Sequence, residues 1–96
     1  MKNIVLITGG GKRLGSLIAK ELSKESFHIV LHYNKSEKQA LETKDEIIKN
    51  GGKIDLIRKE ITSENDAMDL IGESINFLED DDNQQFTLIN NASAFK

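Results

Sequence analysis

The chain has 96 residues, a formal net charge of −3 and no cysteine. This length suits one small domain, and the absence of cysteine excludes disulfides and thiolate metal sites. The acidic balance argues against nucleic acid or an anionic membrane surface as a partner, and no apolar run approaches the roughly 20 residues that span a bilayer. Because Met1-Lys2-Asn3 leads straight into an apolar run without a signal peptide, we expect a cytoplasmic protein.

The first apolar run, residues 3–7, is followed by a glycine-rich turn and an amphipathic segment. This order predicts a buried strand, a tight turn and a helix over residues 13–25. A helix N-terminus offers unpaired N–H groups and a partial positive charge to a phosphate, and glycines let the backbone approach it closely. We therefore predict that a dinucleotide diphosphate binds at Thr8, Gly9, Gly11, Lys12, Arg13, Leu14 and Gly15.

Two familiar phosphate-binding patterns do not fit this turn. The G-x-G-x-x-G fingerprint matches Gly9 and Gly11 but meets Leu14 at its third glycine. The G-x-x-x-x-G-K-[ST] loop has Leu6 in place of its first glycine and Arg13 in place of its hydroxyl residue. A purely structural role for the turn stays open on this stretch alone.

Helical and strand patterns alternate after the turn. Residues 27–32 predict a second buried strand. Ser36 and Gln39 have the spacing of a capping box and predict the start of a second helix, which residues 50–52 close. The apolar positions of the two helices are Leu14, Leu17, Ile18 and Leu22 in the first, and Ala40, Leu41, Ile47 and Ile48 in the second.

The last part of the chain predicts two more strands around a third helix. Residues 53–58 alternate in polarity, as in an edge strand with one wetter face. Ser63-Glu64-Asn65-Asp66 caps a helix that carries apolar residues through Leu78. The acidic and amide-rich run 79–85 predicts a solvated loop, and residues 86–89 predict a fourth strand that ends at Asn90-Asn91.

This alternation predicts an α/β fold with a parallel sheet. A phosphate turn after the first strand selects a Rossmann-type, doubly wound sheet of order 3-2-1-4, with a crevice at the carboxyl ends of the first and fourth strands. We expect residues 1–96 to form a single NAD(P)-binding half-domain, truncated after the fourth strand.

The end of the second strand bears on the choice of cofactor. An NAD-binding domain usually has an acidic residue for the ribose hydroxyls there, whereas this chain has His32-Tyr33-Asn34-Lys35-Ser36. Lys35, the Ser36 hydroxyl and Arg13 are suited to surround a 2′-phosphate, which favours NADP over NAD. The alternative is that Lys35 is an exposed lysine and Ser36 a helix cap. His28 and His32 are, by position alone, strand residues rather than ligands or bases.

Three stretches together resemble the short-chain dehydrogenases/reductases, and within that family the pteridine reductase branch. The first is T-G-x-x-x-Arg13-x-G, in which Arg13 stands where the family has its middle glycine. The second is His32-Tyr33-x-Lys35-Ser36, and the third is Asn90-Asn91-Ala92-Ser93-x-Phe95, in which Ser93 replaces a glycine. The resemblance runs over the whole chain.

The resemblance implies hydride transfer from NADPH to a pterin- or folate-type substrate. It implies that Arg13 contacts cofactor and substrate, that His32, Tyr33, Lys35 and Ser36 hold the 2′-phosphate, and that Glu60 and Ile61 lie near the adenine. It also places Asn91, Ala92 and Ser93 beside the cofactor, with Ser93 and Phe95 contacting the pterin.

The family's catalytic Tyr-x-x-x-Lys pair has no counterpart in this sequence. Its one tyrosine, Tyr33, is followed four residues later by Glu37 rather than lysine. We therefore expect no catalysis by the chain alone, and self-association or pairing with another polypeptide through the open edge of the fourth strand. Two alternatives remain: a stand-alone, non-catalytic nucleotide-binding module, and a flavodoxin- or receiver-like signalling domain of strand order 2-1-3-4-5.

Overall fold

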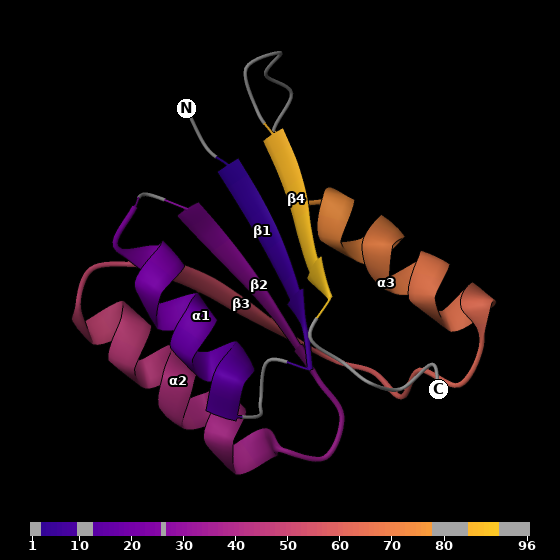
Figure 1. The fold of residues 1–96 in the computed structure, drawn as a ribbon, viewed down its shortest axis with the longest axis horizontal. Coiled ribbons are helices and arrows are strands. Elements are labelled where there is room, and N and C mark those ends of the chain that lie inside the picture. The colour runs from indigo at the N-terminus through magenta and orange to yellow at the C-terminus, as the bar shows by residue number, and fades with distance from the viewer. Residues whose placement is uncertain (1–2, 10–12, 26, 78–84, 91–96) are drawn as a thin grey trace.

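A computed structural model describes residues 3–9, 13–25, 27–77 and 85–90 of the chain. Strands and helices alternate along these residues, as the sequence predicts (Figure 1). The elements are β1 (Asn3–Thr8), α1 (Arg13–Ser23), β2 (Phe27–Tyr33), α2 (Glu37–Lys49), β3 (Lys53–Arg58), α3 (Glu64–Ile75) and β4 (Gln85–Asn90). None of the helices in the described part of the chain is long and apolar enough to cross a membrane.

The sheet has the order β3-β2-β1-β4, which confirms the predicted 3-2-1-4 arrangement. Every pairing is parallel, with Ile4 beside both His28 of β2 and Phe86 of β4. Because all strands run the same way, their carboxyl ends lie at one edge of the sheet (Figure 1). β2 and β3 follow one another outward on one side of β1, whereas β4 lies on its other side, so the strand order reverses between β1 and β4.

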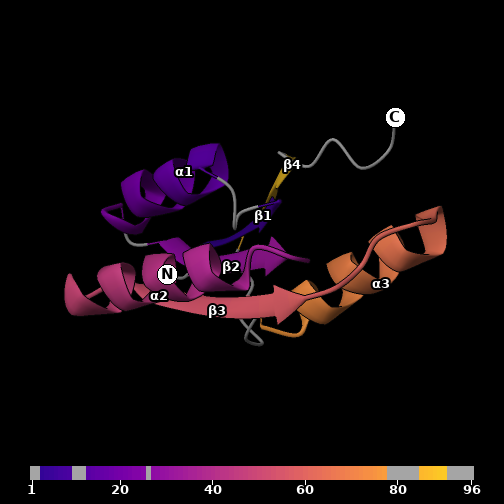
Figure 2. The ribbon, with the colours of Figure 1, turned by 90° about the horizontal axis from the view of Figure 1, so that it is seen from below.

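Helices cover both faces of the sheet. Figure 2 shows α1 and α2 on one side and α3 on the other. Val5 and Ile7 of β1 belong to the core beneath α1 and α2, whereas Ile4 and Leu6 belong to the core that includes Leu70 of α3. Burial on both faces explains why β1 reads as a continuous apolar run rather than an alternating one.

β3 lies at the edge of the sheet, as its alternating sequence predicts. Ile54 is buried against the α1–α2 side, whereas Asp55 on the opposite face is hydrogen-bonded through Oδ2 to Nε2 of His28 in β2 at 2.6 Å. Apart from Ile54, the residues of β3 are half-buried or exposed, and charged side chains are common on edge strands.

The buried faces of α1 and α2 match the expected ones in part, since Ile18 and Leu22 of α1 pack against the core and Ala40 and Ile47 of α2 are buried. Leu14 and Leu17 are 57% and 55% exposed, while Gly15 and Ala19 are buried against the sheet. In α2, Leu41 and Ile48 are likewise exposed, and the residues that face inward are Ala40, Thr43 and Ile47. Small residues at the contact allow a helix backbone to approach a neighbouring element closely, which the spacing of the large apolar residues does not reveal.

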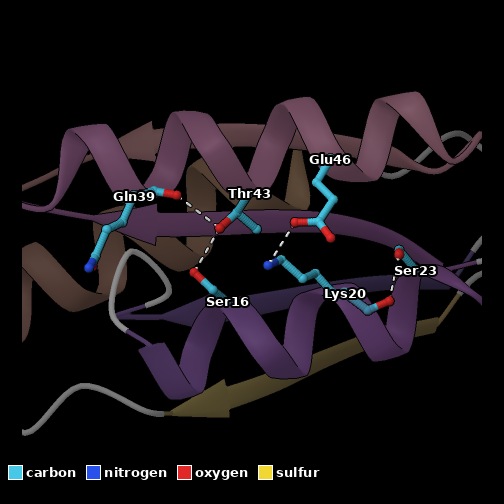
Figure 3. Close-up of polar contacts among 6 residues, drawn as sticks. All are labelled: Ser16, Lys20, Ser23, Gln39, Thr43 and Glu46. Carbon is cyan, nitrogen blue, oxygen red and sulfur yellow. Dashed lines mark hydrogen bonds and ion pairs between the residues drawn. The ribbon is translucent and has the colours of Figure 1, made fainter.

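A buried polar contact joins α1 to α2. The Thr43 hydroxyl is 2.7 Å from Ser16 Oγ and 2.9 Å from the Gln39 carbonyl oxygen (Figure 3). A hydroxyl carries one proton, so both contacts are satisfied when Thr43 donates to the carbonyl and accepts from Ser16. Further along the two helices, Lys20 and Glu46 form a 2.8 Å ion pair (Figure 3).

The two predicted helix caps have different outcomes. At α3 the Ser63 side chain accepts a hydrogen bond from the Asp66 N–H, so this cap is confirmed. The Asp66 carboxylate accepts hydrogen bonds from the Thr62 N–H and hydroxyl, and these bonds lower the pKa of Asp66. At α2, Ser36 is the N-cap residue but its side chain forms no capping hydrogen bond, so the predicted capping box is wrong in this respect.

Some predicted boundaries shift by a few residues. α1 ends at Ser23, because Lys24 and Glu25 form turn hydrogen bonds to the carbonyls three residues before them. β4 extends over Gln85–Asn90 because its pairing with β1 runs from Asn3 to Thr8. Leu78 and residues 79–84 of the expected loop lie outside the described residues.

We predict that Thr43→Val lowers the free energy of unfolding by about 1–2 kcal/mol, because it replaces a buried hydroxyl and its hydrogen bonds by a methyl group. Urea denaturation measures the change. Thr87→Val is the matched control, since Thr87 is exposed on β4 and the same replacement should leave stability nearly unchanged. Equal stability of the wild-type chain and Thr43→Val would contradict a stabilising role for this contact.

Candidate functional site

The strand ends around β1 bring together residues from three parts of the chain. At the carboxyl end of β1, the Thr8 hydroxyl donates a 2.8 Å hydrogen bond to Oδ1 of Asn90, the last residue of β4. This bond joins the carboxyl ends of β1 and β4, the two strands between which the strand order reverses. Open α/β sheets bind their ligands at such a point. The threonine of the glycine-rich motif thus meets the first asparagine of the Asn-Asn motif.

β2 contributes a histidine that supports the glycine turn. Gly9 has a φ of 64°, a left-handed conformation that favours glycine. Its N–H donates a 3.1 Å hydrogen bond to Nδ1 of His32, and Nε2 of His32 donates to the Lys59 carbonyl at 2.8 Å. His32 therefore connects the first turn to the chain just beyond β3.

These bonds require the neutral form of His32, protonated on Nε2. Burial lowers the pKa of His32 below its ordinary value of 6.5, and the positive charge of Lys59 acts in the same direction. The hydrogen bond to the Lys59 carbonyl opposes this shift without reversing it. Protonation at Nδ1 would place two N–H donors opposite each other, so the neutral ring is the one that supports Gly9.

His32 and Tyr33 do not have the positions expected for direct phosphate ligands. His32 is only 5% exposed and uses both ring nitrogens within the protein, so it is a support for the turn instead. The Tyr33 side chain packs in the core beneath α1 and α2. Its main-chain carbonyl accepts a hydrogen bond from the Lys59 N–H and so ties β2 to β3.

The segment between β2 and α2 remains accessible. Lys35 is exposed, and the Ser36 hydroxyl is not used to cap α2. Arg13 lines a groove of about 580 Å³ together with Gln39 and Thr43, so it lies beside the first turns of α2. The three residues predicted to surround a 2′-phosphate thus belong to the same end of the α1–α2 layer.

The remaining predicted residues fall into two groups. Glu60 is exposed, whereas Ile61 is 9% exposed and lines a small hollow of about 130 Å³ with Thr8 and Asn90. Gly15 is buried in the first turn of α1, and Leu14 is exposed beside it. The other predicted residues, which lie outside the described residues, are Gly11, Lys12, Asn91, Ala92, Ser93 and Phe95.

Sequence reasoning missed two residues that shape the site. Asn90 was expected only to end a strand, yet it accepts the hydrogen bond from Thr8. Lys59 was not singled out, although its main chain contacts both His32 and Tyr33. The adjacent asparagines were a usable signal for the first residue, but a main-chain contact such as that of Lys59 leaves no trace in residue identity.

Comparisons with known proteins agree with this architecture. Residues 3–95 match the family described as short chain dehydrogenase. The short-chain dehydrogenase/reductase homolog YusS of Bacillus subtilis is 32% identical over 76 residues, which cover 79% of this chain and 70% of YusS. The hydroxynaphthalene reductase-like protein Arp2 of Metarhizium anisopliae is 38% identical over 72 residues, which cover 75% of this chain and 27% of Arp2.

Solved structures show the same similarity. A putative dehydrogenase from Burkholderia cenocepacia with bound NADP has a TM-score of 0.71 and 29% identity, over 78% of this chain and 29% of its own. FolM alternative dihydrofolate reductase 1 from Brucella canis, complexed with NADP, has a TM-score of 0.66 over 76% of this chain and 29% of its own. At 23% identity, the FolM match shows a shared fold alone. The family match, the similarity to YusS and the strand order together show that the chain belongs to the short-chain dehydrogenase/reductase family.

Proposed function

We propose that the chain forms the NADPH-binding portion of a short-chain dehydrogenase/reductase. The observation that carries this proposal is the pair of bonds Thr8–Asn90 and Gly9–His32, which fix the ends of β1, β2 and β4 around the point where the strand order reverses. The Burkholderia relative, which has bound NADP, supports the choice of cofactor. The chain spans 27% of Arp2, so the activity of a whole enzyme is part of the proposal.

The described donors fit a cofactor that carries phosphate groups. The left-handed Gly9 begins the turn over which α1 opens, and a helix N-terminus favours negative charge. Lys35 and the uncapped Ser36 provide a cation and a hydroxyl at the end of β2, where an acidic residue would favour NAD. When bound, NADPH supplies a hydride, and these residues bind and orient it.

We propose a pterin- or folate-type substrate for the complete enzyme. The support is the resemblance of the three motifs to pteridine reductases, together with a fold shared with FolM. The stand-alone nucleotide-binding module remains the second candidate.

We predict that the 96-residue chain binds NADPH but does not oxidise it in the presence of a dihydropterin, because no residue pair in the sequence replaces the proton-donating tyrosine and its lysine. NADPH absorbance at 340 nm, followed with the purified chain and 7,8-dihydrobiopterin, checks this. Steady turnover that follows the amount of chain would contradict the absence of catalysis.

A charge reversal at Lys35 tests the cofactor assignment. We predict that Lys35→Glu weakens NADPH binding roughly 10- to 100-fold and leaves NADH binding almost unchanged, because it removes one charge-assisted hydrogen bond to the 2′-phosphate. Calorimetric titration with both dinucleotides measures the two affinities. Lys49→Glu is the matched control, since Lys49 is an exposed lysine at the opposite end of α2. Equal losses for NADPH and NADH would contradict the assignment.

The neutral His32 ring predicts a pH dependence of stability. The folded-state pKa of His32 lies below 6.5, so the unfolded chain takes up a proton first as the pH falls. We predict that this contribution is complete above pH 6.5 and is lost below it, by about 1.4 kcal/mol per pH unit, until the folded-state pKa is reached. Urea denaturation from pH 7.5 to 5 measures this contribution as a difference between two chains: stability should fall more steeply with decreasing pH in the wild-type chain than in His32→Asn.

A further inference from the structure

Arg58 has a position that neither the sequence motifs nor the family comparison brings out. It is the last residue of β3 and pairs with Tyr33, the last residue of β2. Its Nε donates a 3.1 Å hydrogen bond to the carbonyl oxygen of Asn34, and the adjacent Lys59 N–H donates to the Tyr33 carbonyl at 2.9 Å. The end of β3 is therefore bonded to the chain where it leaves β2.

The hydrogen bond through Nε leaves the rest of the guanidinium for another partner. An arginine has five N–H donors, and the two terminal nitrogens carry four of them. Within the described residues, no carboxylate forms an ion pair with Arg58. Since Asn34 directly precedes Lys35 and Ser36, this exposed cation is anchored beside the segment that offers a lysine and an uncapped serine.

The local charges favour an anion held by several groups rather than by one. Lys35 and Arg58 supply positive charge here, as does Arg13 beside the first turns of α2, and Glu37 and the exposed Glu60 oppose them. A single lysine is a flexible point charge, and the nearby carboxylates of Glu37 and Glu60 weaken its attraction for an anion. An arginine whose Nε is already bonded has a fixed plane, which suits two parallel hydrogen bonds to a phosphate.

We propose that Arg58 determines cofactor specificity by binding the 2′-phosphate of NADPH together with Lys35 and Ser36. This rests on the proposed function, because it names a further residue for the same cofactor. Arg58 comes from β3, whereas the residues predicted to hold the 2′-phosphate come from the start of α1 and the end of β2. Its role depends on the bond to Asn34, which selects the orientation of the guanidinium before the cofactor arrives.

The test measures dissociation constants of NADPH and NADH, and of 2′-AMP and 5′-AMP, by calorimetry for Arg58→Gln and Arg58→Lys. The matched control is Lys53→Gln, which removes an exposed positive charge from the other end of β3. Circular dichroism confirms that each variant folds. We expect Arg58→Gln to weaken NADPH and 2′-AMP at least 10-fold while NADH and 5′-AMP change less than twofold. Arg58→Lys should restore part of the loss, and Lys53→Gln should match the wild-type chain.

Two results would overturn the proposal for Arg58 alone. One is a wild-type preference for NADPH that survives in Arg58→Gln. The other is an equal loss for NADPH and NADH, which would make Arg58 a support for the 34–36 segment only. A wild-type chain that binds NADH as tightly as NADPH, or binds neither, would instead refute the proposed cofactor and the role of Arg58 with it.

Discussion

The site depends on one imidazole ring that accepts a hydrogen bond from the residue after β1 and donates one to the chain just beyond β3. His32 is buried at the end of β2, accepts from the Gly9 N–H and donates to the Lys59 carbonyl. It thereby links the first turn to the chain beyond β3 through a side chain of β2, in addition to the bonds that Arg58 and Lys59 make to Asn34 and Tyr33. The ring can form both hydrogen bonds only in its neutral form, and burial favours this form by lowering the pKa of His32. The same burial that stabilises the sheet thus sets the protonation state on which the turn relies.

The fold was predictable because its signals are local. The apolar run of β1, the glycines after it and the regular exchange of helical and strand patterns specify a parallel sheet and its order before any contact is known. The alternation in residues 53–58 likewise identified an edge strand. Each of these features follows from the pattern of apolar, polar and glycine residues within one segment, whichever residues pack against it.

The details that failed depend on specific neighbours. Leu14 and Leu17 fit a helical stripe as well as Gly15 and Ala19 do, and only the close approach of α1 to the sheet decides which pair is buried. The bonds of His32 to Gly9 and Lys59, and of Arg58 to Asn34, join residues more than 20 positions apart in the sequence. Residue type alone does not reveal whether a histidine at a strand end faces a ligand or a main-chain carbonyl.

The Thr8–Asn90 bond has a consequence for how rigidity is distributed. β4 is the least enclosed strand, with Leu88 45% exposed, whereas β1 is buried along Ile4–Ile7. Local opening starts where the fewest apolar contacts are broken, so amide exchange should be fastest along β4 among the strands. The small hollow lined by Thr8, Leu88 and Asn90 lies at the border between this exposed strand and the buried β1. A ligand that contacts both sides would therefore slow the fluctuations of β4 and spend part of its binding free energy on that ordering.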